Sequence, residues 1–260
     1  MANTPILIHT CIFQAFVSVL RGAVECVPSN IPVISDIVMQ ISKELFSFLE
    51  SLKANNNRDW FKAHKSEFDA HNADVKAFFR EVENGLQSTD RIDKHSVFRI
   101  YRDVRFAKDK SPYKTGFSGY FRRATAARRG SYYLKISPGN SFVGGGFYGP
   151  NADDLKRIRQ EFEIDDSEMR DVINDPTFVQ YFGEIKGNEL KTAPKGFDKT
   201  HPAIDLIRKK QFYLERTFTD EEVLSERFIE DVVETFQGVR PFFDSMSSIL
   251  TTDLNGESVL

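Results

Sequence analysis

The sequence predicts an α+β protein, a single domain in which helices flank a central antiparallel sheet. Apolar residues recur at helical spacing before residue 96 and after residue 148, whereas between these positions they alternate with a period of two. Short connections join the alternating segments, which favours antiparallel neighbours. No change of composition divides residues 39–250, so we expect one domain there and a frayed tail over 251–260.

The composition fits a globular chain with a local rather than a general charge feature. Of 260 residues, 40% are hydrophobic and 13% aromatic, which provides for a sizeable core. The net charge is −3, so the molecule as a whole is not a polyelectrolyte binder. Both cysteines, Cys11 and Cys26, lie near the N-terminus, which excludes a cysteine metal site elsewhere and fits a reducing, cytoplasmic location.

Residues 1–38 are interpreted as an N-terminal extension of uncertain status. Residues 5–20 are mostly apolar, but this stretch is short for a spanning helix, which needs about 20 residues. It also lacks the basic region and the cleavage site of a signal peptide, so we expect no membrane contact. Met39 directly precedes a well-formed helix, which suggests an added segment or translation from an upstream start.

Two amphipathic helices are predicted at the start of the domain. The first ends at the Asn-Asn-Asn turn of residues 55–57, because asparagine side chains compete with the helical backbone. Asn57 can cap the second helix, which is expected to run without a break over residues 58–86. His64 and His71 lie on its buried stripe about 10 Å apart along the axis. This separation is too large for one metal ion, and no metal site is expected.

Five strands are predicted, four of them in quick succession. Their expected ranges are 97–106, 115–123, 131–137, 141–148 and 211–218. Pro138, Gly139 and Asn140 form a turn, so the third and fourth strands should pair as a hairpin.

Helices return after the fourth strand. Asn151 or Asp153 caps the first of them, and Gly183 ends the third. Residues 191–202 are expected to be a loop, because two prolines and a glycine discourage regular structure.

The C-terminal part is also predicted to be helical. Thr219 and Glu222 have the spacing of a capping box. A longer helix follows from Ser225, and Pro241 is expected to kink or restart it, because proline removes a helical hydrogen bond.

The main functional candidate lies within residues 96–130, where ten Lys/Arg accompany two Asp. The expected ligand-binding residues are Arg99, Arg102, Arg105, Lys110, Tyr113 and Lys114. On a regular strand, Arg99, Asp103 and Arg105 would share one face, and two arginines around an acid suit a carboxylate or phosphate clamp. Arg102 would fall on the apolar face, so it needs a carboxylate partner, a bound anion or a bulge.

Three interpretations of this cluster stay open. It could bind a small anionic ligand, and Asp103 as base and Tyr113 as acid are the catalytic candidates if a reaction follows. The basic run 108–129 could instead bind nucleic acid, with Tyr113, Tyr120 and Phe121 available to stack on bases. The arginines could also be an internal ion-pair network of a structural or interaction module.

Two further segments are secondary candidates. Three glycines interrupt the fourth expected strand, namely Gly144, Gly145 and Gly146. A close packing contact competes there with a ligand cradle. Lys195 and His201 lie on the 191–202 loop, where a binding role competes with an ordinary solvated loop. The chain has no P-loop, H-E-x-x-H, G-x-S-x-G or C-x-x-C motif, so a hydrolase of the common classes is not expected.

The segment 99–117 resembles the signature of a largely bacterial family, domain of unknown function 2461. The matching positions are Arg99, Arg102, Asp103, Arg105, Phe106, Asp109, Lys110, Tyr113 and Lys114. Residues 55–61, 142–146 and 193–202 are also similar to segments of that family, and the likeness covers about residues 39–250. The resemblance implies a bacterial origin, and it implies no activity, cofactor, ligand or oligomeric state.

Overall fold

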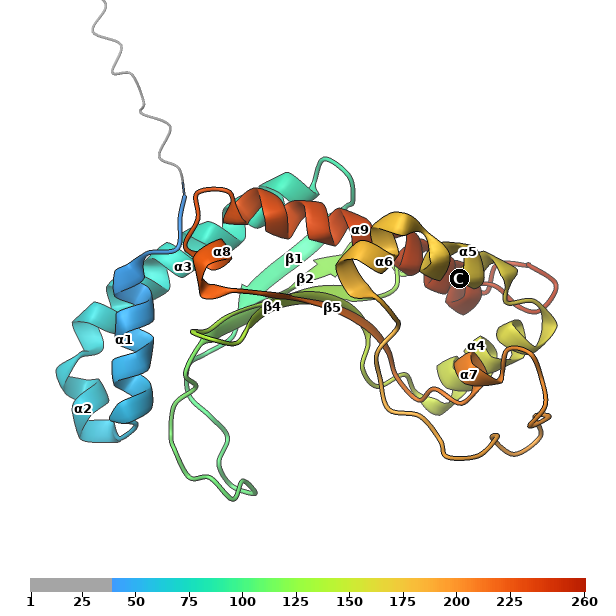
Figure 1. Cartoon of the computed structure of the whole chain (residues 1–260), viewed down its shortest axis with the longest axis horizontal. Coiled ribbons are helices and arrows are strands. Elements are labelled where there is room, and N and C mark those ends of the chain that lie inside the picture. Colours follow the sequence, from blue (N-terminus) through green and yellow to red (C-terminus); the bar gives the residue numbers. More distant parts are fainter. Residues whose placement is uncertain (1–38) are drawn as a thin grey trace, which may run out of the picture. The chain divides into compact units, whose positions relative to one another are not determined.

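The computed structural model describes residues 39–260, all of which belong to one compact unit (Figure 1). These residues form helices and a five-stranded antiparallel sheet, so the predicted α+β class and the single domain are confirmed. The predictions for the apolar segment 5–20, the two cysteines and the N-terminal extension lie outside the described residues. Within residues 39–260, no helix is both long and apolar enough to cross a membrane.

The first helical region differs from its prediction by a break at His64. It consists of α1 (Lys43–Ala54), α2 (Arg58–Ala63) and α3 (Lys65–Leu86). Asn57 caps α2 as expected, by accepting a hydrogen bond from Trp60 N at 2.9 Å. The unbroken helix predicted over 58–86 is wrong, because α2 ends at His64. The amide and Nδ1 of His64 both bond Trp60 O, at 3.1 and 2.8 Å, and its ring stacks on the indole.

The sheet has the strand order β1-β2-β3-β4-β5, and all four neighbouring pairs are antiparallel. Its strands are β1 (Ile92–Val97), β2 (Phe117–Arg123), β3 (Ser131–Ile136), β4 (Ser141–Phe147) and β5 (Phe212–Phe218). The predicted hairpin between the third and fourth strands is confirmed as β3 and β4. β5 completes the sheet beside β4, although the helices between them occupy much of the intervening chain.

The strand predicted over 97–106 is wrong. The edge strand β1 ends at Val97, and residues 98–116 form a loop, here called the 98–116 loop. Within it, the pairing of the two legs is limited to one isolated bridge between Tyr101 and Tyr113. The apolar alternation that suggested a strand arises partly from Ile100, which is buried in the core from a loop position. The apolar strand face on which Arg102 was expected therefore does not exist.

The later helices follow the sequence closely. Between β4 and β5 lie α4 (Ala152–Ile164), α5 (Ser167–Asn174), α6 (Pro176–Phe182) and α7 (Ile204–Ile207). Asn151 caps α4, and Gly183 ends α6 with a φ of 70°, both as predicted. The segment 191–202 contains no helix or strand, which confirms the expected loop.

After β5 come α8 (Asp220–Val223) and α9 (Phe228–Thr251). The capping box of Thr219 and Glu222 is confirmed at the start of α8. Pro241 does not restart the last helix, because α9 continues through it to Thr251. Beyond α9, in the segment expected to fray, Val259 N donates a hydrogen bond to Thr251 O at 2.9 Å.

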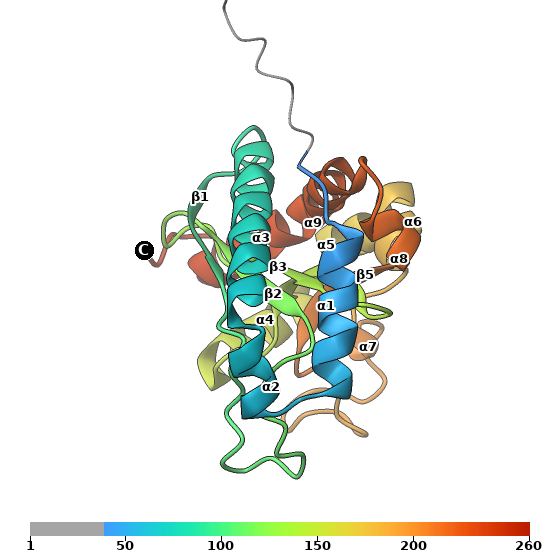
Figure 2. The ribbon, with the colours of Figure 1, turned by 90° about the vertical axis from the view of Figure 1, so that its left-hand side faces the viewer.

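Helices α3 and α9 cover one face of the sheet (Figures 1 and 2). On this face the Tyr132 ring contacts Phe236 and Phe243 of α9, each with a centroid distance of 4.9 Å. Tyr133 and Lys135 alternate with buried residues of β3 and therefore point to the opposite side, where both are half-buried. We call this opposite side the second face.

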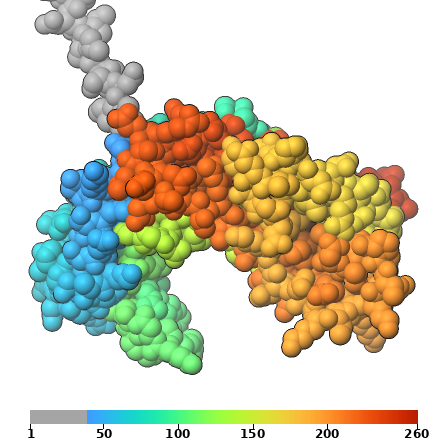
Figure 3. All heavy atoms as spheres, viewed as in Figure 1, coloured from blue at the N-terminus to red at the C-terminus, as the bar shows by residue number. Residues whose placement is uncertain are grey.

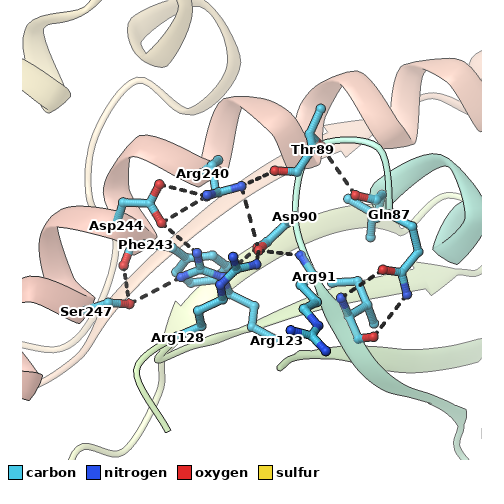
Figure 4. Close-up of polar contacts among 12 residues, drawn as sticks. Gln87, Thr89, Asp90, Arg91, Arg123, Arg128, Arg240, Phe243, Asp244 and Ser247 are labelled. Carbon is cyan, nitrogen blue, oxygen red and sulfur yellow. Dashed lines mark hydrogen bonds and ion pairs between the residues drawn. The ribbon is translucent and has the colours of Figure 1, made fainter. Parts of the chain in front are cut away.

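A buried ion-pair network joins the turn before β1, β2 and α9 (Figure 4). The side chains of Asp90 and Arg123 are each 1% exposed, and Arg123 also donates to Asp244 at 2.6 Å. Asp90 accepts further hydrogen bonds from the Tyr132 hydroxyl at 2.8 Å and from Arg128 at 2.9 Å. The members of this network are distant along the chain, so their spacing in the sequence does not reveal it.

Candidate functional site

A pocket of about 700 Å³ lies between the 98–116 loop, the end of α1 and the second face of the sheet. Its cationic residues are Lys53 from α1, Arg102 and Lys114 from the loop, and Lys135 from β3. Asp109 is the one acidic residue of the lining. Figure 3 shows the surface hollowed beside the loop, which is coloured green. Cations from separate elements thus converge on one concave surface.

The loop is anchored to the helices by the Asn-Asn-Asn turn. Asn56 Nδ2 donates to Tyr113 O at 3.0 Å, and Tyr113 N donates to Asn56 Oδ1 at 3.1 Å. The Tyr113 ring is 5% exposed and stacks on Phe61 with a centroid distance of 4.0 Å. Next to this anchor, Lys114 N donates to Ile100 O at 2.8 Å, which ties the two legs of the loop together. These contacts hold Lys114 at the pocket.

Arg102 has the carboxylate partner that was one of its three expected environments. Its guanidinium pairs with Asp109 and donates to Ser111 O at 3.1 Å. Asp109 also accepts hydrogen bonds from the hydroxyl and the amide of Ser111, at 2.6 and 2.9 Å. These hydrogen bonds, first that of the Ser111 hydroxyl, hold the pKa of Asp109 well below its ordinary value. Asp109 therefore remains an anion that fixes Arg102 at the pocket wall.

Lys114 and Lys135 are half-buried cations that form no ion pair within residues 39–260, although the charge of Glu215 partly opposes the effect of burial on Lys135. Their Nζ atoms stand over the rings of Phe98 and Phe142, at 5.2 and 5.6 Å from the ring centroids. Neither ammonium forms an ion pair or a hydrogen bond with any side chain or carbonyl of residues 39–260. Burial lowers the pKa of both lysines, and the charge of Arg99 lowers that of Lys114 further. A bound anion would offset this cost.

The structure brings half of the predicted ligand-binding residues into the pocket. Arg102, Tyr113 and Lys114 line it, whereas Arg99, Arg105 and Lys110 do not. Lys110 Nζ donates to Val104 O at 3.0 Å and so closes the tip of the loop on itself.

The catalytic candidates Asp103 and Tyr113 are not brought together, since only Tyr113 lines the pocket. Asp103 accepts two hydrogen bonds from the Arg105 guanidinium, at 2.9 and 2.6 Å, and both side chains are largely exposed. The Arg105 hydrogen bonds lower the pKa of Asp103. Solvent screens a surface pair of this kind, so it contributes little to stability and is not what holds the sheet together.

Sequence reasoning missed two cations of the pocket, Lys53 and Lys135. Lys135 carried a usable signal, because it alternates with the apolar residues Leu134 and Ile136 of β3 and must point away from the core. Lys53 carried none, because an exposed lysine near a helix end is ordinary.

The secondary candidates lie elsewhere. A Cβ added to Gly144 or Gly146 would lie 2.4 Å from a carbonyl oxygen of β5, and one added to Gly145 would lie 2.8 Å from the Phe243 ring. Close packing therefore accounts for all three glycines. Lys195 is exposed, and His201 Nδ1 accepts a hydrogen bond from Ala203 N at 3.1 Å within its own turn. Neither residue lines the pocket.

The aromatic residues expected to stack on nucleic acid bases are mostly inaccessible. Tyr113 and Phe121 are 5% and 0% exposed, and only Tyr120 is half-buried. Arginines in the second half of the 108–129 run form ion pairs with aspartates. Arg122 pairs with Asp93, and Arg123 pairs with Asp90.

Comparison with known proteins identifies one family. A family model described as "Conserved hypothetical protein (DUF2461)" matches residues 44–244. No curated protein and no solved structure matches the chain. In the described part of the chain, no three His, Cys, Asp or Glu side chains are grouped so that they could hold a metal ion.

Proposed function

The chain belongs to the DUF2461 family of conserved hypothetical proteins, and from the pocket we propose that it binds a small ligand carrying a phosphate or carboxylate group. The observation that carries the proposal is the convergence of Lys53, Lys114 and Lys135. These cations come from three separate elements, and none of them forms an ion pair with an acidic side chain of residues 39–260. A concave surface lined by charges of one sign attracts ligands of the opposite charge, here an anion.

The cationic residues of the pocket contribute to binding in different ways. Lys114 and Lys135 supply compact ammonium groups, which suit a compact anion such as phosphate. Arg102 is held by Asp109 and therefore acts as a fixed donor at the edge of the pocket. With four cationic residues and one acidic residue in the lining, the local charge favours an anion although the whole chain is slightly acidic.

The volume of the pocket supports a small metabolite, rather than a polymer, as the ligand. Ligand pockets for small molecules span about 300–1,000 Å³, a range that includes this pocket of about 700 Å³. We place the activity in the bacterial cytoplasm, which the sequence resemblance and the cysteine usage support.

Thermal unfolding of the full chain against inorganic phosphate, sugar phosphates, nucleotides and small carboxylates tests the proposal. A ligand present at 100 times its dissociation constant should add about 2.7 kcal/mol to the unfolding free energy and raise the melting temperature. Lys135→Met should remove most of this shift, because it deletes one ammonium from the pocket.

The matched control is Lys76→Met, since Lys76 is an exposed lysine of α3 that does not line the pocket. It should leave the ligand-induced shift unchanged. The proposal fails if no member of the panel raises the melting temperature, or if a shift survives both Lys135→Met and Lys114→Met.

A further inference from the structure

Three aromatic side chains form a continuous wall beside the lysines of the pocket. They are Phe98 from the loop, Tyr133 from β3 and Phe142 from β4. The ring centroids of Phe98 and Tyr133 lie 6.4 Å apart, and those of Tyr133 and Phe142 lie 5.4 Å apart. The wall and the cations therefore belong to one pocket.

This wall does not serve the hydrophobic core. Tyr133 and Phe142 lie on the second face, whereas the neighbouring Tyr132 and Leu134 are buried beneath the helices. Phe98 is 40% exposed, although it is a large apolar side chain. Exposed aromatic residues gathered in a concave site mark a surface that is covered when a ligand binds.

Two of the three rings have a role in the fold, because each supports a lysine ammonium group. The ammonium groups of Lys114 and Lys135 stand over Phe98 and Phe142, respectively. No cation of residues 39–260 stands over Tyr133, and its hydroxyl bonds no group in that range. Tyr133 thus presents a ring that carries no cation and a hydroxyl group that has no partner in the described fold.

From this arrangement we propose that the ligand is a phosphate ester that carries an aromatic ring, of the nucleoside monophosphate class. The phosphate binds Lys114 and Lys135, and the base packs against Tyr133 within the same wall. The inference rests on the proposed function, because it assigns a chemical class to the anion bound in that pocket. The ammonium groups lie 5.2 and 5.6 Å from the centroids of the rings beneath them. The phosphate and the base of such a ligand would therefore contact adjacent parts of the pocket.

Titration calorimetry of the full chain with three probes tests this assignment. The probes are inorganic phosphate, ribose 5-phosphate and adenosine 5′-monophosphate, of which the last two differ only by the base. Stacking of a base on an aromatic side chain corresponds to about a tenfold gain in affinity or more. The monophosphate should therefore bind at least about tenfold more tightly than ribose 5-phosphate.

Tyr133→Leu should weaken binding of the monophosphate by about tenfold and leave ribose 5-phosphate within about twofold of its original affinity. Phe106→Leu is the matched control, because Phe106 is 97% exposed and does not line the pocket. It should change neither affinity. If Tyr133→Leu melts early, Tyr133→Ile takes its place, since a β-branched side chain suits a strand and likewise lacks the ring.

Each other outcome overturns the assignment in a distinguishable way. Equal affinities for the monophosphate and ribose 5-phosphate would reject the ring-bearing ligand and leave the proposed anion site standing. Failure of all three probes to bind would reject this assignment and the phosphate form of the proposed function, and the carboxylates of the thermal panel would then decide the remaining form. Tighter binding of a ten-residue oligothymidylate than of the monophosphate, with steep salt dependence, would replace the small ligand by single-stranded nucleic acid.

Discussion

Asp90 and Arg123 connect the turn before β1 to the last residue of β2 through an ion pair of 2.5 Å between Oδ2 and Nε. Both side chains are 1% exposed. Burying two charges costs several kcal/mol each unless hydrogen bonds satisfy the remaining atoms. Here Tyr132, Arg128 and Asp244 supply those hydrogen bonds, so the pair is stable and positions the edge of the sheet against α9.

Arg123→Met should lower the unfolding free energy by about 3–5 kcal/mol, because it leaves the Asp90 carboxylate buried without its main partner. The double change Asp90→Asn with Arg123→Met should cost less than the two single changes added together. Urea denaturation measures both quantities. Arg105→Met is the control, with little expected loss of stability, since its partner Asp103 is exposed. Equal losses for Arg105→Met and Arg123→Met would contradict the structural role of the buried pair.

The stability of the protein should fall in acid through Asp90. Burial by itself raises the pKa of Asp90, but the hydrogen bond from Tyr132 and the charge of Arg123 outweigh it and lower the pKa below the ordinary value of 3.8. A carboxylate with a depressed pKa in the folded state stabilises fully above its unfolded pKa. That contribution is lost as the pH falls through the folded pKa.

Urea denaturation between pH 2 and 6 should show this decline. Tyr132→Phe removes the hydroxyl that donates to Asp90, so the folded pKa moves back towards 3.8. The decline in that variant should therefore be smaller and should be complete at a higher pH. An identical acid profile in the two proteins would show that Tyr132 does not hold the carboxylate in its ionised form.

Asn56→Ala should loosen the 98–116 loop without unfolding the domain. It deletes both hydrogen bonds between the Asn56 side chain and the backbone of Tyr113, each with a net contribution of about 0.5–1.5 kcal/mol. Hydrogen exchange at the Tyr113 amide should accelerate by about tenfold or more, and anion affinity should fall. Asn55→Ala is the matched control, because within residues 39–260 the Asn55 side chain bonds only Ser51 O of α1. Unchanged exchange in Asn56→Ala would mean that other contacts anchor the loop.

Anion affinity should decline with rising pH below the ordinary lysine range. Burial lowers the pKa of Lys114 and Lys135 from 10.5, so both lose their charge at a lower pH than an exposed lysine. Binding requires the charged forms and is therefore strongest at neutral pH. In Lys135→Arg the guanidinium stays charged, so the decline measured with inorganic phosphate between pH 8 and 10.5 should become shallower. A decline of equal steepness in this variant would exclude Lys135 from the binding site.

Gly145→Ala should destabilise the protein by about 1–3 kcal/mol, the usual cost of overpacking a core. The added methyl group would lie 2.8 Å from the Phe243 ring and 3.0 Å from a methyl group of Val239, so α9 would have to move away from β4. Gly149→Ala, where no atom lies within 4 Å of the added methyl group, should change stability by less than about 0.5 kcal/mol. Thermal unfolding of the two variants measures the difference. A neutral Gly145→Ala would show that the sheet and α9 adjust freely to each other.

Local chemistry predicted much of the secondary structure. The caps at Asn57 and Asn151, the end of α6 at Gly183 and the capping box at Thr219 depend on side chains and backbone groups within a few residues of each other. The edge strand β1 was not predicted, and a strand was expected over 97–106 instead. An edge strand pairs on one side only, and its apolar pattern is weaker than that of the loop which follows it.

By itself the sequence determined the α+β class, most helix ends, the β3–β4 hairpin and a basic segment around Arg102 and Lys114. Each of these follows from periodicity or from contacts between residues close in the chain. Only the tertiary structure decided that Lys53 and Lys135 join Lys114 in one pocket, and that Asp90 meets Arg123 in the interior. Those contacts join residues from separate elements, and their formation depends on how the strands and helices pack, which spacing along the chain does not specify.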